Sequence, residues 1–259
     1  MKIKDFLKKH LPAPVVHFLG LTKNLLKGHF KIIEWTPRYN EDGLITTHYP
    51  TFMEDDKFIT CYNSAVKENL AVSDNLHWRE HTIVWAANRG KNLGGDFVEC
   101  GVNKGFFSKI AMDYIGFKEL SKTFFLLDTY EGLVEKYLTE NEKKKGIKAG
   151  GYEPCYKQVL STFKDYKNVK IIKGSVPETL LQVTSKKIAY LSIDMNCVIP
   201  EIATAEYFWN KMVSGAAIIL DDYGHAGHEE QRYAFDKFAK DKNVNILCLP
   251  TGQGLILKP

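Results

Sequence analysis

The sequence predicts an α/β fold: a doubly wound, Rossmann-like sheet of seven strands, six of them parallel and the last one antiparallel. Two observations indicate this class. From about residue 96, short apolar runs alternate with stretches whose apolar residues recur every three or four positions, which is typical of a parallel sheet with crossover helices. In addition, only T-G-Q-G separates the last two runs, which is enough for a hairpin but too short for a parallel crossover.

Seven apolar runs are the candidate strands. The run Y-L-S-I at residues 190–193 is mostly apolar on both faces, as expected of a central parallel strand. Residues 104–115 and 229–240 have the spacing of amphipathic helices. In chain order the runs are D-F-V-E-C, T-F-F-L-L-D, V-K-I-I-K-G, I-A-Y-L-S-I-D, G-A-A-I-I-L-D-D, V-N-I-L-C-L-P and G-L-I-L-K-P.

The overall composition is that of an ordinary globular protein. The 259 residues suffice for one large domain with an appended segment or for two small domains, and 44% of them are hydrophobic and 25% charged. A net charge of +4 is too small to indicate nucleic-acid binding, and no run reaches the ~20 apolar residues needed to span a bilayer. The five cysteines are scattered and form no C-x-x-C pair, which favours a reducing, cytoplasmic setting.

The residues before the sheet are expected to form a segment of their own. We expect residues 1–95 to be a basic, helical N-terminal cap and residues 96–259 to be the sheet domain. Within the cap, residues 1–30 mix lysines with apolar residues. They predict a helix that packs on the domain or on a second subunit, or else a membrane-surface helix. Residues 31–95 are expected to be helices over the ligand-binding edge of the sheet, and residues 131–153 a solvated insert or a mobile lid.

The ends of the first three strands indicate a cofactor site. In E-C-G-V-N-K-G, Gly101 and Gly105 permit a tight turn and close approach to a ligand before a helix begins, although ordinary turns also contain two glycines. The spacing differs from the dinucleotide motif G-x-G-x-x-G, which favours a cofactor without a pyrophosphate. Asp128 is placed to accept hydrogen bonds from ribose hydroxyls. Gly174 and Ser175 would border an adenine ring, and Ser175 could instead cap the next helix.

Three aspartates follow the next two strands. Asp194 ends the fourth strand, and Asp221 and Asp222 end the fifth. Because neighbouring strands lie about 4.8 Å apart, we expect these carboxylates to converge and to repel one another unless a cation lies among them. Mg²⁺ is the predicted cation, and the alternative is that Asp221 or Asp222 only caps a turn. His225 follows in D-D-Y-G-H and is either catalytic or a polar surface residue.

Together these motifs resemble a known enzyme family. The segments G-D-F-V-E-C-G-V-N-K-G, L-L-D-T-Y-E-G-L, I-D-M-N, I-I-L-D-D-Y-G and T-G-Q-G are similar to the macrocin and mycinamicin sugar O-methyltransferases, the TylF/MycF type of class I methyltransferase. The resemblance covers roughly residues 75–259 and implies an oligomeric enzyme that uses S-adenosylmethionine and Mg²⁺ to methylate a hydroxyl of a sugar or related small metabolite. It places Glu99, Gly101, Gly105, Asp128, Thr129, Gly174 and Ser175 at the cofactor and Asp194, Asp221 and Asp222 at the metal.

The sequence departs from this family at Asn196. The family commonly has D-G-D where this chain has D-M-N, and an amide cannot take a proton from a substrate hydroxyl. Proton removal is then expected to fall to His225, to a metal-bound hydroxide or to an acidic substrate, with Asp194 holding the cation. Two other functions suit this kind of sheet, namely a non-catalytic cofactor-binding or assembly protein and a nicotinamide-dependent oxidoreductase.

Overall fold

The computed structural model describes residues 36–71 and 75–259, so the prediction for residues 1–30 lies outside the described residues. The described residues divide into two compact units, of which the smaller contains residues 36–40 and 45–50 and the larger residues 41–44 and the described residues from 51 to 259. None of the helices in residues 36–71 or 75–259 is long and apolar enough to cross a membrane.

A short hairpin begins the described chain. Its strands are β1, Tyr39–Glu41, and β2, Leu44–Thr46, and Asp42 and Gly43 between them both have positive φ angles, 49° and 71°. An Asp-Gly pair adopts this turn readily, because glycine accepts positive φ at no steric cost and aspartate tolerates it. The expectation that residues 31–95 are helical is therefore wrong for this stretch, and N-E-D-G-L contained the hairpin signal.

The main sheet confirms the predicted fold class. Its strands are β3 Asp96–Cys100, β4 Phe124–Asp128, β5 Val169–Lys173, β6 Ile188–Ile193, β7 Met212–Leu220, β8 Leu247–Cys248 and β9 Gly254–Leu257. They lie in the order β5-β4-β3-β6-β7-β9-β8. Strands β3 to β7 pair in parallel, and β9 is antiparallel to both β7 and β8. The antiparallel strand is thus last in the chain but lies inside the sheet.

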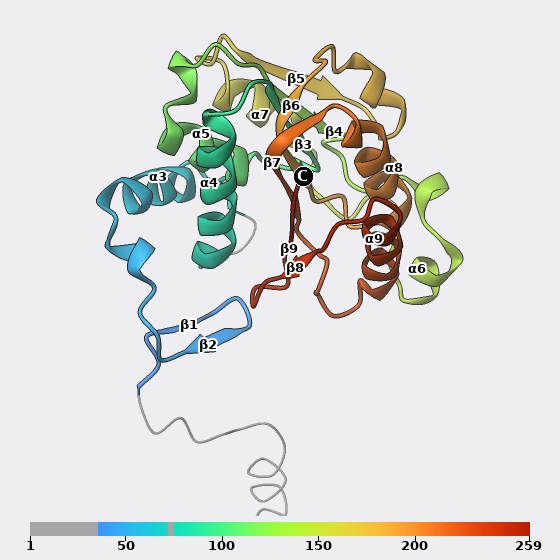
Figure 1. Cartoon of the computed structure of the whole chain (residues 1–259), viewed down its shortest axis with the longest axis horizontal. Helices are drawn as coiled ribbons and strands as arrows, with labels where there is room; N and C mark the ends of the chain where they lie inside the picture. The colour runs from blue at the N-terminus through green and yellow to red at the C-terminus, as the bar shows by residue number, and fades with distance from the viewer. Residues whose placement is uncertain (1–35, 72–74) are drawn as a thin grey trace, which may run out of the picture. The chain divides into compact units, whose positions relative to one another are not determined.

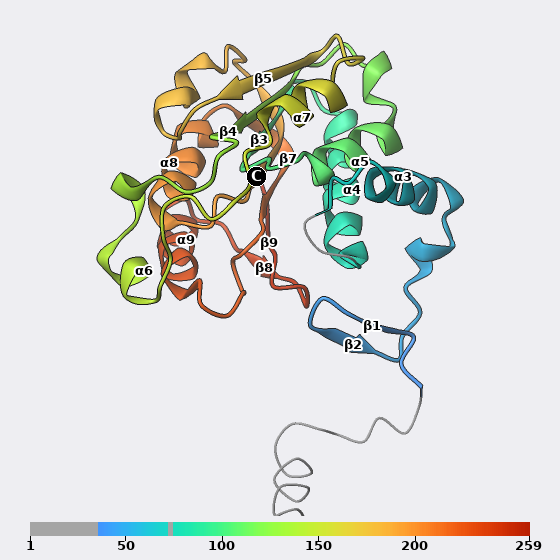
Figure 2. The same ribbon diagram turned by 180° about the vertical axis from the view of Figure 1, so that it is seen from behind.

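Helices cover both faces of this sheet (Figure 1, Figure 2). One face is covered by α4 His77–Lys91, α5 Phe106–Ile115 and α7 Tyr156–Thr162, and the other by α8 Val198–Trp209 and α9 Glu229–Asp241. Helix α3, Asp56–Lys67, packs on α5. The shorter helices are η1 Thr51–Glu54, η2 Phe117–Glu119, η3 Glu135–Tyr137, α6 Glu140–Lys144 and η4 Glu178–Gln182. Although α4 was expected in a cap over the edge of the sheet, it packs directly on β6, β7 and α5.

The centre of the sheet is also its switch point. All six residues of β6 are buried, as its apolar run predicted. From β3 the chain builds outward through β4 and β5, and it then returns to add β6 and β7 on the other side. Gly101, after β3, has a φ of 91°, and a Cβ there would lie 1.7 Å from the backbone oxygen of Asp194, after β6. Only glycine allows these two strand ends to lie so close together.

Candidate active site

A cavity of about 360 Å³ lies at the carboxyl ends of the parallel strands. Its wall contains a residue at or just after the end of each of them, namely Gly101 of β3, Asp128 of β4, Gly174 of β5, Asp194 of β6 and Asp221 of β7. Ligands of doubly wound sheets bind at this edge, beside the switch point. The topology therefore brings most of the predicted site residues to one cavity.

Asp128 fixes the shape of the turn that follows β3. Its Oδ2 accepts hydrogen bonds from the backbone N–H groups of Val102 at 2.7 Å and Asn103 at 2.8 Å, and its Oδ1 accepts one from Tyr130 at 2.5 Å. A carboxylate has about four lone-pair positions, so these bonds leave some capacity for a ligand. Asp128 lines the cavity, and its position suits a ribose hydroxyl.

Glu99 and Gly105 do not line the cavity. Glu99 is 1% exposed and accepts a hydrogen bond from the Ser108 hydroxyl at 2.6 Å, which ties β3 to α5. Burial raises the pKa of Glu99 to about 8. Gly105 begins α5 with a φ of 85°, and a Cβ there would lie 2.6 Å from the Phe163 ring. Both residues therefore act on the site from behind its wall.

Thr129, Gly174 and Ser175 lie on the wall beside Asp128. The Thr129 hydroxyl donates to the backbone oxygen of Gly132 at 2.6 Å, and the N–H of Gly174 donates to the backbone oxygen of Asp128 at 2.9 Å. The Ser175 hydroxyl bonds the Glu178 carboxylate at 3.1 Å. The Gly174 bond joins the ends of β4 and β5, and the other two hold the loops that follow these strands.

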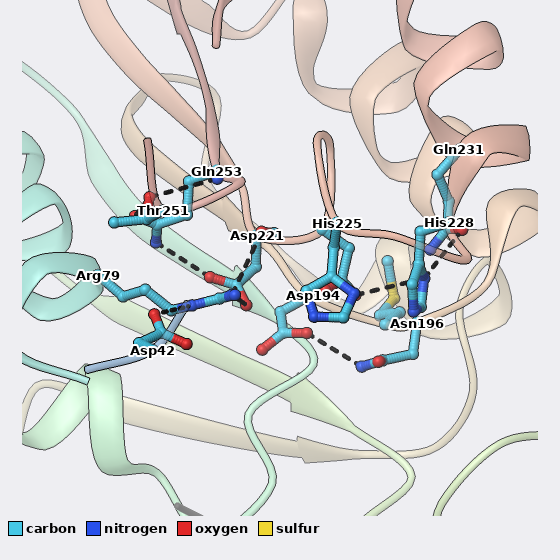
Figure 3. Close-up of polar contacts among 12 residues, drawn as sticks. Asp42, Arg79, Asp194, Asn196, Asp221, His225, His228, Gln231, Thr251 and Gln253 are labelled. Carbon is cyan, nitrogen blue, oxygen red and sulfur yellow. Dashed lines mark hydrogen bonds and ion pairs between the residues drawn. The ribbon is translucent and has the colours of Figure 1, made fainter. Parts of the chain in front are cut away.

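An arginine that the sequence did not indicate lies against the acid cluster (Figure 3). Arg79 of α4 donates to Oδ2 of Asp221 at 2.6 Å and to Asp42 at 2.8 Å, and Gln253 donates to Oδ1 of Asp221 at 3.0 Å. Burial alone would lower the pKa of Arg79, but the carboxylates of Asp221 and Asp42 raise it above its ordinary value. The repulsion expected among the three aspartates is thus relieved in part by a cation that the protein itself supplies.

Asp194 lies on the same wall and is bound by Asn196. The Asn196 amide donates to Oδ1 of Asp194 at 3.0 Å, and Asn196 has a φ of 55°, in the left-handed region that asparagine tolerates. Burial, together with the charges of Asp221 and Asp222, raises the pKa of Asp194 well above its ordinary value. Where the resembling family has a second acid, this chain therefore has a hydrogen-bond donor that orients the first.

The third aspartate lies next to two histidines instead. Asp222 is 9% exposed, and its Oδ2 lies 3.7 Å from Nδ1 of His228. His225 and His228 line the cavity with it, and their rings meet edge to face at 5.4 Å. Among the described residues, one set of three His, Cys, Asp or Glu side chains has all its ligand atoms within 4.8 Å of one another, and it consists of Asp222, His225 and His228.

The insert at residues 131–153 forms another part of the wall, through Leu133, Val134, Tyr137 and Tyr152. Helix α6 anchors it. Glu142 is 2% exposed and accepts from the backbone N–H of Thr139 and of Val198 at the start of α8, each at 2.8 Å. The Thr139 hydroxyl donates to Glu230 in the first turn of α9, and the Lys145 ammonium group donates to the backbone oxygen of Gly227, just before that helix. The insert is therefore held against α8 and the start of α9 where it lines the cavity.

A family match covers most of this site. The family model described as Macrocin-O-methyltransferase (TylF) matches residues 80–247, well over half of the chain. This span includes α4 from Glu80 onward and the strand ends from Gly101 to Asp222. Among curated proteins, no sequence matches the chain.

Solved O-methyltransferases share the fold at low sequence identity. The O-methyltransferase NovP has a TM-score of 0.65 and 15% identity, over 80% of this chain and 98% of its own. The calicheamicin methyltransferase CalS11 has a TM-score of 0.57 and 12% identity, over 95% of this chain and 94% of its own. An O-methyltransferase from Bacillus cereus, in complex with SAH, has a TM-score of 0.53 and 12% identity, over 80% of this chain and 96% of its own. At these identities the likeness establishes the fold alone.

Proposed function

Because the chain belongs to the macrocin-O-methyltransferase (TylF) family, we propose that it transfers the methyl group of S-adenosylmethionine to a hydroxyl of a sugar or related small molecule. The observation that carries this proposal is the cavity at the switch point, with an acidic side and a side of backbone donors and small residues. The family match favours methyl transfer over the nicotinamide-dependent and non-catalytic functions considered from the sequence. One other CalS11 structure is described as a TDP-rhamnose 3'-O-methyltransferase, which suggests the class of acceptor.

The cofactor is assigned to the side of the cavity formed by Gly101, Asp128, Thr129, Gly174 and Ser175. Gly101 lets the backbone approach a ligand closely, and Asp128 retains lone pairs for ribose hydroxyls. When bound, S-adenosylmethionine supplies a methyl group on a positively charged sulfur, which an acceptor oxygen can take up by displacement.

Asp194 is the proton acceptor that we assign for the hydroxyl. It lines the cavity, and the Asn196 amide holds its Oδ1 at 3.0 Å, which leaves Oδ2 for the substrate. His225 also lines the cavity and is the other candidate. Substitutions distinguish these two candidates for the base. If Asp194 is the base, Asp194→Asn should reduce the rate of methyl transfer by about 10²- to 10⁴-fold, and His225→Gln should not reduce it.

The predicted Mg²⁺ site at Asp194, Asp221 and Asp222 fits the contacts only in part. Asp222 has an oxygen without a hydrogen-bond partner among the described residues, which suits a cation. Asp221, however, already binds Arg79 and Gln253 through both oxygens and would have to share them. The three-aspartate site therefore stays a prediction, and no step of the reaction is assigned to Mg²⁺.

Calorimetric titration of the full chain with S-adenosylmethionine tests the cofactor assignment. Ser175→Phe places a ring on the assigned wall and should weaken binding by at least about tenfold, which is about 1.4 kcal/mol. Ser185→Phe is the matched control, because Ser185 bonds the backbone of Lys187 outside the cavity. Absence of cofactor binding by the unaltered chain would exclude the proposed function. Conversion of S-adenosylmethionine to S-adenosylhomocysteine in the presence of TDP-rhamnose or other nucleotide sugars then tests the acceptor class.

A further inference from the structure

In the segment after β7, three side chains of types that can bind metal ions follow one another at intervals of three residues. It reads D-D-Y-G-H-A-G-H, with Asp222, His225 and His228 three residues apart. The N–H of His225 donates to the backbone oxygen of Asp222 at 3.1 Å, and the N–H of His228 donates to that of His225 at 3.2 Å. These two bonds close successive four-residue turns. One ligand atom from each of the three side chains lies within 4.8 Å of the others.

Asp222 lacks the partner that a buried carboxylate needs. It is 9% exposed, and its Oδ2 has no hydrogen-bond partner among the described residues. The nearest ring nitrogen, Nδ1 of His228, is 3.7 Å away, too far for a hydrogen bond. A buried hydrogen-bond acceptor without a partner lowers the stability of the fold, and a cation between this carboxylate and the imidazoles would remove that penalty.

Buried neighbours also set the orientation of His228. Gln231 is 1% exposed, its amide nitrogen lies 3.5 Å from Glu201, and its amide oxygen lies 3.1 Å from Nδ1 of His228. Because the amide oxygen of Gln231 accepts from Nδ1 in this orientation, an ion at the site would be bound through Nε2 of His228. Metal-binding histidines are commonly oriented by such a bond from the other ring nitrogen.

We propose that Asp222, His225 and His228 bind a divalent transition ion, such as Mn²⁺, Co²⁺ or Zn²⁺, at the edge of the cavity. Two imidazoles and one carboxylate suit ions of this group, whereas Mg²⁺ prefers oxygen ligands alone. Three protein ligands leave positions open for water or a substrate oxygen. Any part in methyl transfer rests on the proposed function, but ion binding does not. In this arrangement His225 is a ligand, and Asp194 is left to accept the proton.

Titration of the full chain with Co²⁺, followed by its visible absorption and by calorimetry, tests the site. We expect one ion per chain, displaced by Zn²⁺ and not by Mg²⁺ in excess. His225→Gln should weaken Co²⁺ binding by about 100-fold or more. Because His225 is exposed, this change leaves the packed core intact. His48→Gln, at an exposed histidine that is not part of the cavity lining, is the matched control and should bind as the unaltered chain does.

A further variant separates the two metal sites. Asp221→Asn should leave Co²⁺ binding within a few fold if the histidine site holds the ion, and should abolish it if three aspartates do. Unchanged Co²⁺ binding by His225→Gln, or equal competition by Mg²⁺, would overturn the inference. Cofactor binding is measured in a separate calorimetric titration with S-adenosylmethionine in the presence of a chelator. Failure of cofactor binding can therefore be distinguished from failure of ion binding.

Discussion

Replacement of the buried Glu99 by glutamine is expected to make folding stability less sensitive to pH. Burial raises the pKa of Glu99 from its ordinary value of 4.5 to about 8, so the folded chain holds this proton more tightly than the unfolded chain does. A carboxyl with a raised pKa contributes stability that is fully present below the unfolded pKa. That contribution is lost as the pH rises toward the folded pKa.

The size of the effect follows from this pKa. At ~1.4 kcal/mol for each pH unit between the two pKa values, the ionisation of Glu99 removes about 2–3 kcal/mol of unfolding free energy between about pH 5 and about pH 7. Glutamine has the same shape and retains an oxygen for the Ser108 hydroxyl, but it does not ionise over this range. The difference between the unaltered chain and Glu99→Gln therefore isolates this one group from other buried acids, such as Glu80.

Urea denaturation at a series of pH values, followed by circular dichroism, measures the difference. The stability of Glu99→Gln relative to the unaltered chain should rise by about 2–3 kcal/mol from about pH 5 to about pH 7. Ser108→Ala is the matched control, because it removes the hydrogen bond but keeps the ionising carboxyl. Parallel pH curves for the unaltered chain and Glu99→Gln would refute the reasoning. Cofactor affinity should be unchanged, because Glu99 does not line the cavity.

Three further substitutions test the contacts around the site. Arg79→Met leaves the charge of the buried Asp221 without its partner. It should lower the unfolding free energy, measured by urea denaturation, by about 3–5 kcal/mol, and adding Asp221→Asn should recover much of that loss. Glu142→Ala leaves two backbone donors without an acceptor and should cost about 1–3 kcal/mol in the same assay, whereas the exposed Glu140→Ala should cost little. Gly101→Ala cannot fit without moving the end of β6, so calorimetry should show weakened cofactor binding; unchanged affinity would contradict the close approach.

The strands and the edge of the sheet that carries the cavity could be predicted because each has a local signal. An apolar run such as Ile188–Ile193 indicates a strand buried on both faces, and parallel topology brings the ends of such strands to one edge. Asp128 and Asp194 therefore reach the cavity as their positions after strands implied. Glu99 shows the limit of this argument, because alternation along β3 turns it away from the cavity and into the protein.

The partner of Asp221 could not be predicted in this way. Arg79 lies 142 residues earlier in the chain, and no local pattern tells which residue of α4 reaches the acid cluster. Gln253 was visible only as part of a hairpin link. His228 differs, because its spacing of three from His225 and of six from Asp222 was open to inspection. It became informative only once two successive turns were known to bring it close to His225 and Asp222.

The interior position of β9 affects how the protein can fold. On the side of β7 away from β6, Ala217–Leu220 pair with β9, and β9 follows every other strand in the chain. Until β9 inserts, a partly folded chain exposes the apolar edge of β7, which is a template for pairing with other chains. The same interval leaves Asp221 without Gln253, because that residue directly precedes β9. Coverage of the β7 edge and completion of the acid cluster therefore both depend on the insertion of β9.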